Sequence, residues 1–486
     1  MFLTSTLRKS VASIALTSFL ALSAGCQKEG LLESQFAPQT AAENSLNGQL
    51  IDGQYIVVFK NNSTGAFTGS NEQGLTASRT DAAKMRQHVF EAAGVERTDV
   101  SQIYEGIVNG FAARLSKAQL AALRTNTDIA YIEQDRYIAL GGISTTLFAK
   151  GGSKGDKNLN GNGKGKNEPL PSEPAPTEPA PADPAPADPA PADPAPADPA
   201  PTPTEPAPMP TEPAPAPTAP TPAPGYTTVT PMTGEVLSWT VERVGFGDGT
   251  GKTIWIIDSG IDTDHPDLNV DLNRCASFIY NMPSVEDGFG HGTNVAGIIA
   301  AKNNGSGMLG VASNATIVAL RVFDDAGSGS ISRAISAVNH ASNYAKPGDV
   351  VNMSLGGGIS NTLDNAVITA AGKGILFAIA AGNSALDCKD TSPARVDAAG
   401  VYTVSGMDVN NMLVSSSNFG PAVDFSAPGA NVTVTTIGGG TAGGYGGTSM
   451  AAPHVAGILL LRGTVFTQGY ISGDKDGIPD PIASVQ

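Results

Sequence analysis

The chain has 486 residues, a formal net charge of −16 at pH 7 and hydrophobic side chains at 41% of its positions. One hydrophobic core rarely supports more than about 250–300 residues, so this length excludes a single small domain and favours two or three structural units. The acidic balance and the lack of an extended basic surface argue against a nucleic-acid partner. Five lysines between residues 150 and 166 lie among glycine and asparagine, a composition typical of a solvated segment.

The first 26 residues have the layout of an export signal. Arg8 and Lys9 precede an apolar run at 11–22, and small residues follow up to Cys26. The apolar run is too short for a stable membrane anchor. The stretch "LSAGC" resembles the bacterial lipoprotein signal, although Ser23 stands where that pattern prefers leucine. Two interpretations of residues 1–26 therefore stay open, lipidation of Cys26 with membrane attachment, and ordinary secretory cleavage.

Residues 50–140 predict a small α+β domain. Alternating and apolar runs indicate strands at 53–60, 110–116 and 129–135. Helical periodicity indicates helices at 80–93 and 117–126. Three strands and two helices are enough to form one compact domain.

Residues 150–225 predict a linker that is rich first in glycine and lysine and then in proline and alanine. The pentapeptide "PADPA" repeats within 168–224, a stretch with nine acidic residues and no basic ones. Such a composition buries no core and favours extended polyproline II, which would span on the order of 180 Å at about 3.1 Å per residue. A spacer is the favoured interpretation, and a ligand for a proline-binding partner is the alternative.

Residues 230–486 predict an α/β domain. Strands that are apolar throughout occur at "TIWII", "TIVAL", "VVNM", "ILFAIA" and "VYTVS", and they alternate with helical stretches near 292–301, 331–345 and 362–373. Apolar strands separated by helices indicate a parallel sheet with helices on both faces.

Polar residues that end such strands are the first candidates for chemistry, because open parallel sheets place their sites beyond the carboxyl ends of the strands. Asp258 ends one apolar strand and Asn383 follows another. Either residue alone would be explained equally well as a helix cap or turn former.

The stretch "GGTSMAAPHVAG" places Ser449 and His454 on one predicted helix. A five-residue step at 3.6 residues per turn leaves them roughly 140° apart, so they cannot share a hydrogen bond. Of the five histidines, His291 lies in a glycine-rich entry to an apolar helix, where its imidazole would be accessible. Elimination leaves Asp258, His291 and Ser449, which only a folded domain could bring together.

Five motifs in the same order resemble the subtilisin-like serine proteases (subtilases, peptidase family S8). They are "DSG" at 258–260, "GHGT" at 290–293, "SLGG" at 354–357, "AAGN" at 380–383 and "GTSMAAPHVAG" at 447–457. The resemblance covers about residues 235–465. The domain at 50–140 resembles the inhibitory I9-type propeptide of that family. Asp, His, Ser is also the order of the subtilisin triad.

The resemblance implies that His291 accepts the Ser449 proton as the hydroxyl attacks a peptide carbonyl. Asp258 would fix the imidazole tautomer, and Asn383 would donate to the oxyanion. An oxyanion donor is worth roughly 3 kcal/mol in subtilisin itself. Asn294 departs from the family's His-Gly-Thr-His pattern, although it is not a triad position.

The resemblance also implies a substrate-binding edge and a pocket. Ser354, Leu355 and Gly356 would pair with the substrate main chain as an added strand. Ala380 and Gly382 would leave space for a bulky apolar substrate side chain. The alternative is that these small residues only allow close packing of the strands.

A structural calcium ion is the expected cofactor, with no catalytic metal. The loop at 301–313 has the length of the family's calcium loop, with Asp267 and Asn304 as side-chain ligands and carbonyls from Lys302, Ser306 and Met308. An Asx-rich turn without metal is the alternative. The segment 473–481 also resembles an acidic calcium-binding turn, with Asp474, Asp476 and Asp480, but this resemblance is weaker than that of the loop at 301–313.

We therefore predict an exported serine-type endopeptidase made as a self-processing zymogen. Its own propeptide would be its inhibitor, and proteins or peptides would be its substrates. A catalytically silent binding protein and a dedicated processing protease are the competing classes. The sequence leaves open whether maturation cuts near 140–150, which keeps the linker, or near 225, which discards it. It also leaves open whether Cys275 and Cys388 form a disulfide.

Overall fold

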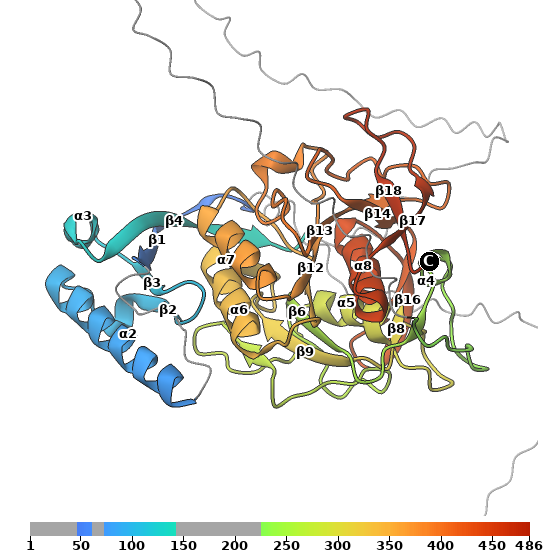
Figure 1. Ribbon diagram of the computed structural model, residues 1–486, viewed down its shortest axis with the longest axis horizontal. Helices are drawn as coiled ribbons and strands as arrows, with labels where there is room; N and C mark the ends of the chain where they lie inside the picture. The colour runs from blue at the N-terminus through green and yellow to red at the C-terminus, as the bar shows by residue number, and fades with distance from the viewer. Residues whose placement is uncertain (1–45, 61–71, 142–224) are drawn as a thin grey trace, which may run out of the picture.

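The computed structural model describes residues 46–60, 72–141 and 225–486, with side chains in the second range from residue 82 onward. The predicted signal peptide at 1–26 and, except for residue 225, the predicted linker at 150–225 lie outside the described residues. Two domains stand side by side, and strand β4 runs between them (Figure 1). No helix in the described part of the chain is both long and apolar enough to cross a membrane.

The N-terminal domain is an antiparallel sheet with two helices packed on one face. Its elements are β1 (Leu50–Phe59), α2 (Glu72–Ala93), the short 3-10 helix η2 (Arg97–Asp99), β2 (Val100–Tyr104), β3 (Gly110–Arg114), α3 (Lys117–Thr125) and β4 (Ile129–Ala139). Its core includes Phe90, Phe111 and Leu123. The predicted α+β class is correct, but β2 was not predicted because its central Ser, Gln and Ile are only half-buried and show no clear alternation.

The larger domain has a nine-stranded sheet in the order β17-β18-β14-β13-β12-β11-β6-β9-β7. The sheet strands are β6 (Thr253–Asp258), β7 (Ala276–Ser277), β9 (Thr316–Arg321), β11 (Val350–Met353), β12 (Leu376–Ala380), β13 (Val401–Met407), β14 (Phe425–Pro428), β17 (Phe466–Tyr470) and β18 (Pro481–Ser484). All neighbouring pairs are parallel except β17 with β18.

Helices cover both faces of this sheet, as predicted. They are α4 (Trp239–Val244), α5 (His291–Ala300), α6 (Ile331–Tyr344), α7 (Asn361–Ala371) and α8 (Thr448–Arg462). Strand β6 shows why its sequence is apolar throughout: Trp255 and Ile257 enter the core under α6 and α7, while Ile254 and Ile256 enter the core under α5 and α8. Figure 1 shows the two helix layers on opposite sides of the sheet.

The remaining strands are short, and the sequence analysis did not identify them. They are β5 (Gly247–Asp248), β8 (Ala312–Ser313), β10 (Ser328–Ser330), β15 (Val432–Thr436) and β16 (Gly440–Tyr445). Strand β10 pairs with β4 of the N-terminal domain, so the smaller sheet has the order β10-β4-β1-β3-β2 and joins both domains.

The acidic turn at 473–481 contains a buried carboxyl group that makes stability depend on pH. Ser405 Oγ donates to Asp480 Oδ2 at 2.6 Å, and burial raises the pKa of Asp480 to about 7, with the charges of Asp474 and Asp476 adding to the effect. The folded chain therefore holds a proton here that the unfolded chain releases above about pH 4. The contribution of this proton to the free energy of unfolding is fully present below about pH 4. It is lost as the pH rises through about 7, the pKa of Asp480 in the folded chain.

Asp480→Asn is therefore expected to raise the free energy of unfolding at pH 8 by on the order of 2 kcal/mol, and to change it little at pH 4. The amide keeps an acceptor for Ser405 and needs no proton. Urea unfolding at both pH values checks this, with Ser449→Ala present in every chain compared. Asp264→Asn, on an exposed side chain that does not act on the pKa of Asp480, is the control. Equal gains at pH 4 and pH 8 would contradict the assignment.

Candidate active site

A buried Asp–His pair lies at the carboxyl edge of the central sheet. Asp258 is the last residue of β6 and His291 is the first residue of α5. His291 Nδ1 lies 2.8 Å from Asp258 Oδ1 and 2.9 Å from Asp258 Oδ2. Because a carboxylate can only accept, the Nδ1–H group donates to it, and Nε2 of the neutral ring is left with its lone pair. The ring can therefore take up a proton at Nε2.

Two carboxylates act on the basicity of this imidazole. Burial of the ring alone would lower the pKa of His291, but the charge and hydrogen bond of Asp258 and the charge of Asp287 outweigh it, so the net pKa is raised. A more basic imidazole is a better proton acceptor for a hydroxyl group.

Asp287 was not selected from the sequence, yet it holds the start of α5 in place. Its carboxylate accepts from Gly290 N at 2.7 Å, from Thr293 N at 2.9 Å and from Ser259 Oγ at 2.9 Å. Ser259 Oγ in turn accepts from Gly292 N at 2.9 Å. These bonds satisfy N–H groups of the first helical turn and tie the helix to the end of β6. An acidic residue shortly before a helix start was the signal that could have identified it.

Ser449 lies in the first turn of α8, which packs against α5 through apolar side chains such as Val295 and Val455. Ser449 Oγ donates to the carbonyl oxygen of Ser354 at 3.3 Å, and Ser354 Oγ donates to the carbonyl oxygen of Ser449 at 2.8 Å. Pro453 has no N–H group, so it cannot make the helical bond to the Ser449 carbonyl. The Ser354 hydroxyl supplies the missing donor and anchors the serine against the end of β11.

Asn383 is held so that its amide nitrogen stays free. Its Oδ1 accepts from Thr448 N at 2.8 Å and from Thr448 Oγ1 at 3.1 Å. Thr448 Oγ1 also accepts from Gly382 N at 3.0 Å. With Oδ1 engaged, the Nδ2 group faces away from Thr448, and the Asn383 side chain is exposed. Thr448, next to the serine, is a positioning residue that the sequence analysis did not select.

The predicted substrate-binding residues divide into buried and accessible ones. Leu355 and Ala380 place their side chains in the two hydrophobic cores, and Ser354 is almost fully buried. Gly356 and Gly382 are half-buried. Gly382 has φ +108°, and a Cβ there would lie 2.5 Å from Asn418 Nδ2, so the turn into Asn383 requires glycine. Packing thus accounts for Ala380 and Gly382, and the pocket stays a prediction.

The predicted calcium ligands lie around one buried carboxylate. Asp267 Oδ1 accepts from Asn304 Nδ2 at 3.0 Å, Asp267 Oδ2 accepts from Met308 N at 3.0 Å, and burial raises the pKa of Asp267. A Cβ on Gly307 would lie 2.3 Å from Asp267 Oδ2, so the loop wraps closely around the carboxylate. Ser306 N and Oγ donate to Asn304 Oδ1. Both Asp267 carboxylate oxygens and Asn304 Oδ1 thus accept hydrogen bonds within the loop, and calcium binding here stays a prediction.

This loop is not a cluster of acidic side chains. Within the described ranges, no three His, Cys, Asp or Glu side chains are grouped to hold a metal ion. Most ligands would be carbonyl oxygens, including the predicted one of Lys302, whose own N–H donates to the Asp267 carbonyl at 3.0 Å.

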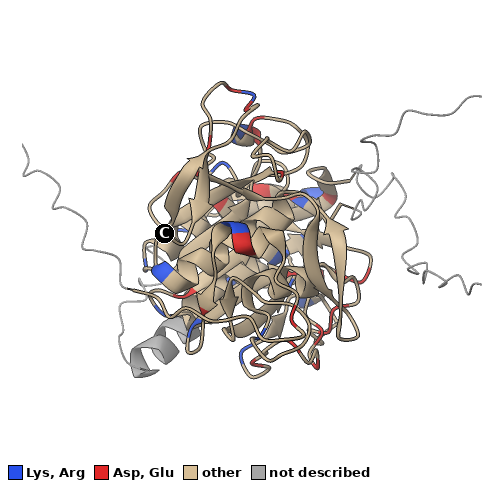
Figure 2. Ribbon diagram, turned by 90° about the vertical axis from the view of Figure 1, so that its right-hand side faces the viewer, with Lys and Arg blue, Asp and Glu red and all other residues tan. Residues whose placement is uncertain are grey.

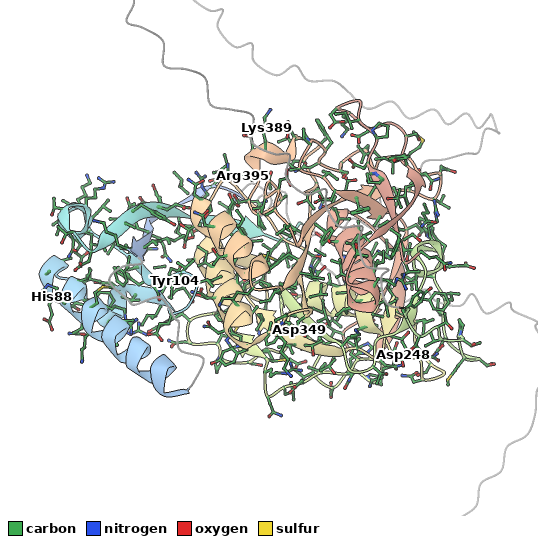
Figure 3. The ribbon with its side chains drawn as sticks, viewed as in Figure 1. His88, Tyr104, Asp248, Asp349, Lys389 and Arg395 are labelled. Carbon is green, nitrogen blue, oxygen red and sulfur yellow. The ribbon has the colours of Figure 1, made fainter. Side chains whose placement is uncertain are left out.

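The other histidines have partners of their own or lie far from the Asp–His pair; His265 Nδ1, for example, accepts from Asp267 N at 3.1 Å. His454 is buried in α8, its Nδ1 donates to the Met450 carbonyl at 2.8 Å, and burial lowers its pKa to about 4. The His340 ring packs against the rings of Trp255, Phe278 and Tyr344. His88 lies on α2, on the side of the N-terminal domain away from the larger domain (Figure 3).

The structure gives the surroundings of the two cysteines and of Asn294. Cys275 and Cys388 are both free thiols. Asn294 is buried, and its side-chain amide lies 3.0 Å from the carbonyl oxygen of Gly290 and 2.7 Å from that of Thr435, so with its nitrogen toward them it links α5 to β15. On the face shown in Figure 2, Lys and Arg are scattered among acidic and uncharged residues without forming a continuous basic surface.

The N-terminal domain contacts the larger domain at the starts of two helices. Glu133 Oε2 accepts from Thr362 N at 3.1 Å and Thr362 Oγ1 at 2.8 Å, at the start of α7. Asp135 Oδ1 accepts from Ser332 N at 3.0 Å, at the start of α6. Tyr104, which lies between the domains in Figure 3, donates its hydroxyl to the Ser332 carbonyl at 3.2 Å. Carboxylates at helix N-termini make favourable contacts with the helix dipole.

A parallel α/β sheet with Asp, His and Ser in that chain order at one edge defines the class of subtilisin-like serine proteases. The chain belongs to the subtilase family. The family model of that name matches residues 249–466, and the model "Peptidase inhibitor I9" matches residues 54–140.

Similar proteins carry related names. Over 214 residues the chain is 44% identical to Subtilisin Savinase of Lederbergia lenta and to an alkaline protease of Alkalihalobacillus alcalophilus; the match covers 44% of this chain, 76% of the first protein and 54% of the second. The chain thus spans about half the length of several relatives. A crystal structure of a cold-adapted subtilisin-like serine proteinase is 37% identical, with 46% of this chain and 84% of that chain covered and a TM-score of 0.41.

Proposed function

We propose that the protein is an exported serine endopeptidase that hydrolyses peptide bonds of proteins and is made as a self-processing zymogen. The observation that carries this proposal is the buried Asp258 carboxylate bound to Nδ1 of His291. Such a bond leaves Nε2 as a base, and α8 presents Ser449 from the neighbouring helix start. Membership in the subtilase family supports the same activity.

In the proposed reaction, Ser449 Oγ attacks the substrate carbonyl while Nε2 of His291 accepts its proton and later gives it to the leaving amine. Asp258 holds the ring tautomer and stabilises the imidazolium that forms. Asn383 Nδ2 donates to the oxyanion, and it is ready to do so because Thr448 already occupies Oδ1.

The N-terminal domain is proposed to be the intramolecular inhibitor. It is bound through the starts of α6 and α7 and through strand β4, which pairs with β10 beside the site. The I9 model that matches this domain supports the same role. Export is proposed from the signal-like sequence at 1–26. Mass analysis of the released N-terminal fragment distinguishes a lipidated Cys26 from ordinary cleavage.

The decisive experiment compares wild type with Ser449→Ala in the full chain. Wild type is expected to trim itself and to degrade an unstructured protein such as reduced casein, whereas Ser449→Ala remains uncut and inactive. Circular dichroism confirms that both chains fold. If wild type is folded but neither trims itself nor cleaves casein, the protein is a binding protein that keeps the fold. Cleavage of one partner but not of casein would indicate a dedicated processing protease.

We further propose that Asp267, Asn304 and the carbonyls of Lys302, Ser306 and Met308 hold a structural calcium ion. Calcium at 100–1,000 times its dissociation constant stabilises a fold by about 3–4 kcal/mol, which corresponds to a Tm shift on the order of 5–10 °C for a domain of this size. Removal of calcium with EGTA is expected to lower Tm by that amount in the Ser449→Ala chain.

Asp267→Asn is expected to abolish the dependence of Tm on calcium, because it removes the carboxylate ligand. Asp248→Asn is the matched control, since Asp248 is a carboxylate outside this loop whose oxygen accepts from Thr250. Differential scanning calorimetry with and without EGTA measures both variants. An identical Tm for the wild-type loop with and without calcium would favour the alternative, an Asx-rich turn.

A further inference from the structure

We propose that the self-processing bond is the one on the carboxyl side of Gly141, so that residues 142–224 remain on the mature enzyme as its N-terminal extension. The inference rests on the proposed function and goes beyond it by locating the bond. It decides between the two maturation sites that the sequence leaves open.

The first observation is the path of β4 after it leaves its own domain. It pairs antiparallel with β10, with Tyr137 opposite Ser330, Ile138 opposite Gly329 and Ala139 opposite Ser328. The pairing continues past the end of the strand, because Leu140 N donates to the Gly327 carbonyl at 2.9 Å. The chain is therefore held in an extended form up to Leu140, one residue before Gly141.

The second observation is the contact of β4 on its opposite flank. A Cβ on Gly358 would lie 3.0 Å from the Arg136 guanidinium, and a Cβ on Gly357 would lie 3.0 Å from Ile138 Cγ2 and 3.4 Å from the Tyr137 carbonyl oxygen. The contacts pair Arg136 of β4 with Gly358, and Ile138 with Gly357, so residue numbers rise along β4 while they fall along the segment that faces it. The chain thus runs antiparallel between β10 and the "SLGG" segment, and the two glycines leave room for it.

The register of these contacts identifies the residue at the serine. Ile138 lies at Gly357, and both chains advance by about 3.3 Å per residue when extended. Three residues farther along in each direction, Gly141 comes opposite Ser354. Ser354 exchanges two hydrogen bonds with Ser449, and Ser449 Oγ donates to its carbonyl. The Gly141 carbonyl is therefore the peptide carbonyl that this register delivers to the Ser449 hydroxyl.

Side-chain burial shows how this segment is recognised. Ile138 and Leu140, two residues apart and hence on one side of the extended chain, are both buried in the core that contains Leu355. Gly141 has no side chain to fill a pocket. Ile138 and Leu140 therefore anchor the segment, and the cleaved position itself contributes little to recognition.

The alternative cut near residue 225 conflicts with the contacts that follow it. Asp248 N donates to the Thr227 carbonyl at 2.8 Å, and Asn303 Nδ2 donates to the Thr230 carbonyl at 3.0 Å. The Tyr226 ring packs under the Arg462 guanidinium. Residue 225 is therefore tied to the surface of the larger domain through its neighbours and would have to break these bonds to enter the site.

The step is an ordinary peptide hydrolysis. Ser449 Oγ bonds to the Gly141 carbonyl carbon, the bond to the next nitrogen breaks, and the serine proton passes through His291 to the leaving amine. Water then releases the Gly141 carboxylate and restores the serine hydroxyl. The product chain begins at Gly142 and carries the proline-rich segment, and it is no longer joined to Cys26.

To test this, the full chain is expressed in a cell-free translation system that contains no proteases. The new N-terminus is identified at early times by N-terminal sequencing and intact mass. Wild type is expected to begin at Gly142, and Ser449→Ala to remain uncut. A first N-terminus elsewhere, near 225 in particular, with cleavage of casein intact, would overturn this inference and leave the proposed function standing. A folded wild type that neither cuts itself nor cleaves casein would instead overturn the proposed function.

A matched pair of variants tests the register. Ile138→Lys places a charge in the buried anchor and is expected to slow self-cleavage at least tenfold. Tyr131→Lys changes an exposed position of the same strand, outside the contact with β10, and is expected to leave the rate unchanged. Circular dichroism of both variants in the Ser449→Ala background verifies folding. Equal cleavage rates for the two lysine variants would overturn the assigned register.

Discussion

Asp258→Asn is expected to lower kcat by about 10⁴-fold, the loss that removal of the triad carboxylate causes in serine proteases of this class. The amide keeps the size of the carboxylate, but its Nδ2 group would face the Nδ1–H of His291. The ring would turn to the tautomer that accepts at Nδ1 and carries its proton on Nε2. That nitrogen could no longer accept a proton from Ser449.

A trace of wild-type enzyme first matures the variant. Initial rates on a chromogenic peptide are then measured, and the activity of the added wild-type enzyme is subtracted. Asp262→Asn is the control, because Asp262 is equally buried nearby and its Oδ2 accepts from Gly438 N instead of from the histidine. A kcat for Asp258→Asn within tenfold of wild type would show that the Asp–His pair is only structural.

Asn383→Asp is expected to lower kcat by about 10²–10³-fold with little change in KM. The variant keeps an oxygen for the two Thr448 donors, which lie at 2.8 and 3.1 Å from Oδ1. It loses the N–H group that would face the oxyanion and places a negative charge there. The loss should therefore fall on the transition state and not on substrate binding.

Thr448→Val provides the comparison for this prediction. It removes one of the two donors that hold Asn383 and the acceptor for Gly382 N, but it leaves the amide in place. We expect a smaller loss in kcat than for Asn383→Asp, and a steady-state analysis of kcat and KM separates the two. A loss confined to KM in Asn383→Asp would contradict the oxyanion role.

Self-cleavage after Gly141 would also explain the order of segments in this chain. The proline-rich stretch at 168–224 follows the inhibitor domain and precedes the larger domain. When the bond after Gly141 is cut, the stretch stays with the enzyme and can act as a spacer, whereas a cut near 225 would discard it. Release of the inhibitor would at the same time separate the enzyme from any lipid on Cys26.

The comparison of prediction with structure shows where periodicity is informative. Long apolar strands such as β6 and β13 and the helices at their ends were predicted, because burial on both faces leaves a continuous apolar signal. Strands β10 and β15–β18 were not predicted, because they are short, rich in Gly, Ser and Thr, or half-exposed. Their pairing depends on partners far away in the sequence.

The sequence by itself determined the α/β class, the subtilase motifs, and the candidates Asp258, His291, Asn383 and Ser449, because strand ends, glycine-rich helix starts and residue chemistry are local properties. It also excluded His454, because helical geometry is local. Only the tertiary structure decided that Asp287 and Thr448 hold the site, that both cysteines are free, and that Ile138 packs against Gly357. These facts depend on which distant segments pack together, and hydrogen-bond distance and strand register exist only after the chain has folded.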